Sequence, residues 1–79
     1  MQEETELQAR ILKYLQRNAH AAETAEGVNT VWLGRALTEG KVLEVERILD
    51  ALVDAGVLEK YQLPGGSTVF RRARPEGAD

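Results

Sequence analysis

The sequence has no cysteine and a single histidine, His20. Without cysteine the chain has no disulfide framework, no thiol nucleophile and no thiolate zinc site. His20 stands in a polar stretch with no second histidine to complete a metal site, so we expect its imidazole to be solvated. The sequence also lacks a Ser-His-Asp set, a glycine-rich phosphate loop and paired carboxylates in a plausible cleft. We therefore expect neither an enzyme nor a bound metal or cofactor.

Long apolar runs are absent too, because no stretch approaches the roughly 18 residues of a membrane span. The first residues, Met1 to Glu4, are polar and acidic, which is not how a signal peptide starts. We expect a soluble, cytoplasmic protein with no membrane partner. With 79 residues, 43% of them apolar and 29% charged, the chain suffices for one small globular domain, which we expect over residues 1–73.

The net charge is −3, and it is unevenly distributed. Residues 1–59 hold six basic and eleven acidic side chains, whereas residues 60–79 hold four basic and two acidic ones. The local positive excess therefore lies near the carboxyl end, where the cations are Lys60, Arg71, Arg72 and Arg74. Such cations either solvate the edge of a hairpin or contact phosphate groups.

Residues 5–18 are expected to form the first helix. Its apolar stripe at helical spacing consists of Leu7, Ile11, Tyr14 and Leu15. Thr5 and Gln8 fit a capping box at its start. Leu12 lies off the stripe, so the helix is either sandwiched between other elements or feeds a dimer contact.

The next segment, residues 19–27, is rich in alanine and glutamate. It either continues the first helix as far as Gly27 or forms a surface connection. We expect Val28 to add a short strand beside the hairpin and Asn29 or Thr30 to cap a second helix. In that helix Leu33, Ala36 and Leu37 share a face, and we expect Trp32 in the core or at its edge.

A third helix is predicted over about residues 41–55, after a turn at residues 38–41 that contains a glycine and, we expect, no Ser or Thr cap. Its start is either Lys41 or slightly earlier. Phased at about 100° per residue, its buried side consists of Val42, Val45, Ile48, Leu49, Leu52 and Ala55. Its outward side is centred on Leu43, Arg47, Asp50 and Asp54, with Glu44 and Glu46 at the flanks. Gly56 follows as a carboxy-terminal cap.

The chain is expected to end in a β-hairpin, with strands at about residues 57–63 and 68–73. A four-residue loop, Pro64 to Ser67, would place Tyr61 and Phe70 on one face as a cross-strand pair, whereas a bulge at the Gly-Gly tip would change that pairing. Residues 74–79 are rich in Pro, Gly and charge, and we expect a disordered tail there.

The order of helix, turn, helix, glycine and hairpin is the layout of a winged helix-turn-helix. The segment Leu52-x-x-x-Gly56-Val57-Leu58-x-Lys60 resembles the end of the recognition helix and the entry to the wing in winged-helix transcription regulators of the multiple-antibiotic-resistance and arsenic-response types. The resemblance covers about residues 28–73. It implies an α+β, mostly helical fold of three helices and a carboxy-terminal wing. It also implies binding to double-stranded DNA.

Under this resemblance the third helix meets the major groove and the wing meets the DNA backbone or minor groove. Arg47 falls where those regulators often carry an arginine aimed at DNA. The candidate DNA-binding residues are Lys41, Arg47, Lys60, Arg71, Arg72 and Arg74. The acidic outward side of the third helix opposes this interpretation, because its carboxylates repel phosphates, and Arg47 could be paired with Asp50 or Asp54 at helical spacing.

A second interpretation is a protein-docking winged helix, because the fold alone does not imply DNA binding. The acidic face would then bind a basic partner or a second copy of the chain. The candidate residues for this contact are Leu12, Leu43, Glu44, Asp50 and Asp54. A homodimer through the first helix or the amino terminus would suit a reader of palindromic DNA.

Overall fold

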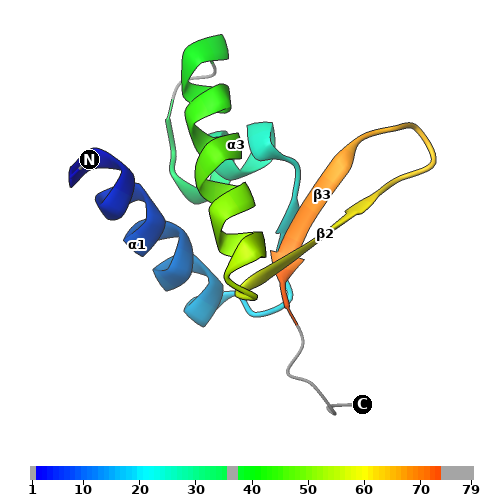
Figure 1. The fold of residues 1–79 in the computed structure, drawn as a ribbon, viewed down its shortest axis with the longest axis horizontal. Coiled ribbons are helices and arrows are strands. Elements are labelled where there is room, and N and C mark those ends of the chain that lie inside the picture. The colour runs from blue at the N-terminus through cyan, green and yellow to red at the C-terminus, as the bar shows by residue number, and fades with distance from the viewer. Residues whose placement is uncertain (1, 36–37, 74–79) are drawn as a thin grey trace.

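A computed structural model of the chain describes residues 2–35 and 38–73. Within these residues the order of elements is α1 (Gln2–Arg17), β1 (Ala22–Glu23), α2 (Ala25–Gly27), the π-helical turn η1 (Val28–Trp32), α3 (Glu39–Asp54), β2 (Leu58–Gln62) and β3 (Thr68–Arg72). The strands form one antiparallel sheet in the order β1-β3-β2. Figure 1 shows α3 standing between α1 and the β2–β3 hairpin. The predicted α+β winged helix-turn-helix architecture is confirmed.

The core lies where α1, η1, α3 and the sheet meet. Ile11 of α1 and Leu49 of α3 are fully buried, and each such side chain contributes about 1.5–3 kcal/mol through removal from water. Trp32 is buried as expected. The other buried apolar members of this cluster are Leu7, Leu15, Val28, Leu33, Val45, Ile48, Leu52, Leu58 and Phe70.

The first helix begins at Gln2, three residues before the expected start. Thr5 is therefore inside the helix, and the predicted capping box is wrong. Leu12 is half-buried and packs against the core. Its position off the main stripe is explained by packing within the fold.

Between α1 and η1 the chain makes a connection that contains β1. Ala22 pairs with Arg71 and Glu23 with Phe70, so the strand that joins the hairpin in the sheet is β1. Val28 follows β1 in the chain and is fully buried in η1. The second helix starts at Ala25, and its cap is Thr24, whose Oγ1 accepts a hydrogen bond from the Gly27 N–H at 3.2 Å. The predicted strand at Val28 and the predicted caps at Asn29 and Thr30 are therefore wrong. Ala36 and Leu37 lie outside the described residues.

The third helix has the Thr cap that we did not expect. Thr38 has extended backbone, and its Oγ1 accepts a hydrogen bond from the Lys41 N–H at 3.3 Å. Because the hydroxyl satisfies a donor of the first turn, α3 starts at Glu39, earlier than Lys41. The predicted turn at residues 38–41 is therefore largely the first turn of the helix.

The buried side of α3 is largely as predicted, with Val45, Ile48, Leu49 and Leu52 in the core. Val42 is only half-buried, and Ala55 is exposed because it lies in the turn beyond the helix.

The helix ends in a Schellman motif at Gly56, which has φ +79°. The Val57 N–H donates to the Leu52 carbonyl at 2.9 Å, and the Gly56 N–H donates to the Val53 carbonyl at 3.0 Å. The predicted glycine cap is therefore confirmed, and the chain turns sharply from α3 into β2.

The hairpin has a three-residue loop, Pro64 to Gly66. The Gly66 N–H donates to the Leu63 carbonyl at 2.8 Å, the Leu63 N–H donates to the Ser67 carbonyl at 2.8 Å, and Gly66 has φ +94°. This is a turn closed by a glycine bulge. It shifts the register by one residue, so that Tyr61 pairs with Val69 and Lys60 with Phe70. The predicted Tyr61–Phe70 pair is therefore wrong, and the two rings lie on opposite faces.

Candidate nucleic-acid interface

The outward side of α3 is exposed along its length. Leu43 is 54% exposed, and Asp50 and Asp54 are exposed on the same side of the helix. The side chain of Arg47 is 75% exposed, and its Nη1 lies 3.7 Å from Glu4 Oε1 of α1. Among the described residues the ion pair of Arg47 is thus with another helix, and neither Asp50 nor Asp54 holds it as we had considered.

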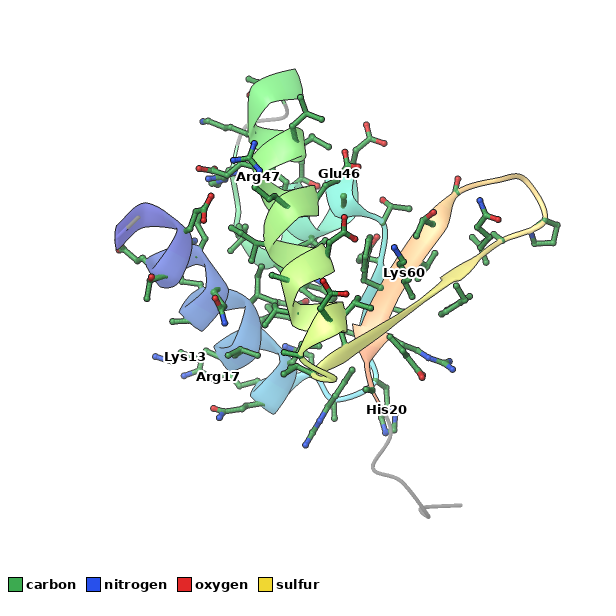
Figure 2. All side chains as sticks on the ribbon, viewed as in Figure 1. Lys13, Arg17, His20, Glu46, Arg47 and Lys60 are labelled. Carbon is green, nitrogen blue, oxygen red and sulfur yellow. The ribbon has the colours of Figure 1, made fainter. Side chains whose placement is uncertain are left out.

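A groove of about 500 Å³ separates α3 from the hairpin. Lys60 projects into it from β2, with Nζ 3.5 Å from Asp50 Oδ1. Figure 2 shows Glu46 and Lys60 on this side of α3. We call this feature the acidic groove, defined by Glu26, Glu46, Asp50 and Lys60 over a floor that includes Val42 and Phe70.

The two arginines of β3 lie on opposite faces of the sheet because neighbouring strand residues alternate. Arg71 donates from Nε to Glu59 Oε1 at 2.6 Å, and its guanidinium stacks 4.8 Å from the centre of the Tyr61 ring. Arg72 is exposed opposite Leu58. Arg74 lies outside the described residues.

The positive charge of the wing is confined to its base. Arg72 pairs with the first residue of β2, and Lys60 is only two residues further along that strand. Residues 61–70, which form the rest of the hairpin, carry no charge. The large apolar side chains exposed there are Tyr61, at 37%, and Leu63, at 43%. A wing of this kind offers cations beside α3 and an apolar, uncharged tip.

Lys41 is exposed in the first turn of α3, and its backbone is tied to the neighbouring segment by Arg35. Arg35 donates from Nε to Asn29 Oδ1 at 2.8 Å, from Nη1 to Glu44 Oε1 at 3.0 Å and from Nη2 to the Lys41 carbonyl at 3.2 Å. Glu44 therefore serves a partly buried ion pair that joins the segment after η1 to α3. The structural role of Arg35 was not evident from the sequence, because its partners come from separate segments.

A second cluster of cations lies on α1 and was not singled out from the sequence. Arg10, Lys13 and Arg17 surround a hollow of about 330 Å³ together with Tyr14 and Trp32. We call it the basic hollow. The sequence could have indicated this cluster, because the spacing of the three cations puts them on one helix face. Figure 2 shows Lys13 and Arg17 on the opposite side of α3 from Glu46 and Lys60.

The structure resembles a solved transcription regulator. No family model and no curated protein matches the sequence. The crystal structure of the Vibrio cholerae ferric uptake regulator, Fur, described as revealing a structural rearrangement of its DNA-binding domains, matches with a TM-score of 0.67 at 25% identity. The match covers 92% of this chain and 55% of the regulator, so the chain spans about half of that protein's length.

Among the described residues no helix has the length and apolarity to cross a bilayer, and no group of three potential metal-binding side chains comes together there. The three helices and the antiparallel sheet match the winged-helix DNA-binding domain of the Fur regulator.

Proposed function

We propose that this chain binds double-stranded DNA through the outward side of α3 and the base of the hairpin, as a small transcription regulator. The observation that carries the proposal is the likeness to the Fur DNA-binding domain over nearly the whole chain. An exposed helix fits the major groove of B-DNA, which is about 12 Å wide. The hairpin next to it would reach the neighbouring backbone.

Arg47 would be the residue that reads a base. Its guanidinium is exposed at the middle of α3, and the 3.7 Å contact with Glu4 joins two exposed groups. An ion pair of this kind contributes at most about 1 kcal/mol, so it can be exchanged for a contact with DNA. A guanidinium that binds guanine through two hydrogen bonds discriminates by about 1–3 kcal/mol.

The remaining candidate cations would contact phosphates. Lys41 and Arg72 are exposed, with no ion pair among the described residues, and Lys60 has only the screened contact with Asp50. Arg71 is held by Glu59 and Tyr61 and would act from a fixed position. Arg74 stays a candidate from the sequence alone. Because Glu46, Asp50 and Asp54 repel phosphates, we expect modest affinity.

The test is a fluorescence-anisotropy titration of the full chain with mixed-sequence duplex DNA at about 50 and 200 mM salt. With about four phosphate contacts, from Lys41, Lys60, Arg71 and Arg72, affinity should fall about 150-fold between the two conditions. Arg47→Ala and the double variant Arg71→Ala/Arg72→Ala should weaken binding, whereas Lys13→Ala/Arg17→Ala, with the same loss of charge as the double variant, should not. Absence of binding at 50 mM salt would overturn the proposal.

Protein docking is the second candidate function, and the exposed Leu43 between acidic side chains favours it. Two residues originally considered for this contact are committed within the fold, because Leu12 packs against the core and Glu44 pairs with Arg35. The docking surface would therefore consist of Leu43, Asp50 and Asp54. If DNA does not bind, a partner captured by the native chain and lost with Leu43→Glu would support this function.

A further inference from the structure

The basic hollow gathers cations that form no ion pair within the described part of the chain. The described ion pairs join Arg35 to Glu44, Arg47 to Glu4, Lys60 to Asp50 and Arg71 to Glu59. Lys13 and Arg17 are exposed and form no ion pair within the described part of the chain, and Arg10 donates from Nη2 to the Leu33 carbonyl at 2.6 Å. Three positive charges on one helix face outnumber the carboxylate of Glu6, which lies one turn before Arg10 on that face, and so favour a negatively charged partner.

Rigid aromatic packing supports this hollow. Tyr14 stacks on Trp32 with ring centroids 5.1 Å apart and an interplanar angle of 15°. Trp32 is buried, so its face is not free to stack on a base, and the hollow therefore does not resemble a nucleobase site. Arg10 is fixed to the chain beyond η1, whereas Lys13 and Arg17 extend from α1. Lys13 and Arg17 are thus two long cationic side chains that extend from a helix held by the Tyr14–Trp32 stack and by the Arg10 hydrogen bond.

The acidic groove has the complementary chemistry. Glu26, Glu46 and Asp50 line it against the single cation Lys60, and Val42 and Phe70 contribute apolar surface. A long Lys or Arg side chain can lay its aliphatic stem on apolar atoms while its charged end reaches carboxylates at the rim. The volume, about 500 Å³ against about 330 Å³ for the basic hollow, leaves room for such side chains.

We propose that the basic hollow of one copy docks into the acidic groove of a second copy, with Lys13 and Arg17 entering between α3 and the hairpin. The two surfaces lie on opposite sides of α3 (Figure 2). The contact is therefore heterologous, and its repetition adds copies head to tail instead of closing a two-fold dimer. It does not depend on DNA binding, but it covers part of the surface proposed to meet DNA.

Sedimentation velocity of the full chain tests the contact across a range of protein concentrations. Exposed charges interact over about 30 Å at 0.01 M salt and about 3 Å at 1 M. The sedimentation coefficient should therefore rise with concentration at 0.01 M salt and return to the monomer value at high salt. A coefficient that stays monomeric at low salt and high protein concentration would overturn the proposal.

A charge swap makes the test specific. Lys13→Glu/Arg17→Glu and Glu46→Lys/Asp50→Lys should each be monomeric alone, and an equimolar mixture should associate, because each variant supplies the surface that the other has lost. Lys41→Glu/Arg72→Glu has the same net charge as the first variant and leaves both surfaces intact, so it should still self-associate. Failure of the mixture to associate, with both variants folded by circular dichroism, would refute the assignment.

The DNA titration separates this contact from the proposed function. Lys13→Glu/Arg17→Glu should lose self-association and bind duplex DNA at least as tightly as the native chain, because the acidic groove is then uncovered. Arg71→Ala/Arg72→Ala should show the reverse pattern, with weaker DNA binding and unchanged self-association. Equal loss of both properties in both variants would contradict the existence of two surfaces.

Discussion

Lys60 of β2 reaches across to Asp50 of α3, with its Nζ 3.5 Å from the carboxylate Oδ1. Lys60 points from the hairpin toward α3, and there it is already paired with a carboxylate of α3. Both side chains are about half exposed, so water and salt screen the pair, and it contributes at most about 1 kcal/mol. The pair is easily broken, but its carboxylate remains on the surface, where it repels phosphate.

Replacing Asp50 with Asn should therefore tighten duplex DNA binding by about three- to ten-fold at low salt, because it frees Lys60 and removes a repulsive charge. Fluorescence anisotropy with the native chain in parallel measures the change. Glu6→Gln makes the same change in net charge on exposed surface of α1, and it should leave the dissociation constant nearly unchanged. Unchanged or weaker binding by Asp50→Asn would contradict a DNA contact at this point of α3.

Replacing Arg35 should lower the free energy of unfolding more than replacing any other charged residue that the structure describes. Its side chain serves the fully buried Asn29, Glu44 and the Lys41 carbonyl at once. Arg35→Met should lower the free energy of unfolding by about 2–3 kcal/mol, because acceptors in a partly buried site lose their donor. Urea unfolding followed by tryptophan fluorescence measures it. Arg72→Met, at an exposed site, should change stability by less than about 0.5 kcal/mol.

Gly56→Ala should destabilise the corner between α3 and β2. The backbone there has φ +79°, a conformation that costs an L-residue about 1–2 kcal/mol, although a Cβ would meet no atom within 4 Å. The expected result is a loss of that size in urea unfolding. A loss below about 0.5 kcal/mol would show that the corner relaxes around the new side chain.

Gly40→Ala should raise the free energy of unfolding, the opposite effect to Gly56→Ala. Gly40 lies in the first turn of α3, its φ is not positive and a Cβ would meet open space. Alanine there restricts the unfolded chain and favours helix, so we expect a gain of about 0.4–1 kcal/mol. Thermal unfolding of this variant beside Gly56→Ala compares a glycine substitution in the first turn of α3 with one just beyond its end.

The parts of the fold that depend on local periodicity could be predicted from the sequence. The buried side of α3 follows from one helical period repeated over several turns, and Gly56 follows from the need for a residue with positive φ at the corner. Leu52 and Val57 then meet through the hydrogen bond that closes the motif. These features need no knowledge of distant residues.

The features that the sequence did not reveal depend on pairing between distant strands or on the geometry of individual turns. Nothing in Ala22 and Glu23 signals a strand, because it exists only through pairing with β3. The hairpin register changed by one residue because Gly66 takes a positive φ and shortens the loop. Thr38 was not recognised as a cap because residues 38–41 were expected to form the turn before the helix.

The same division applies to the candidate site. Arg47, Lys60 and Arg71 could be identified as cations at suitable positions, but their carboxylate partners come from α1, α3 and β2, and tertiary structure alone brings these together. The basic hollow likewise joins α1 to a tryptophan from η1. Charge counted along the sequence therefore overstated how much free positive charge the wing offers.

The hairpin is fastened at its base on both sides, by the Gly56 corner and by the Ala73 N–H, which donates to the Val57 carbonyl at 3.0 Å. Because these two contacts fix where the strands leave the core, Pro64 and Gly65 can be exchanged without redirecting the strands, whereas Gly66 must stay because its positive φ sets the hairpin register. Arginine introduced at the tip of the hairpin would therefore change which partner the protein binds without changing its core.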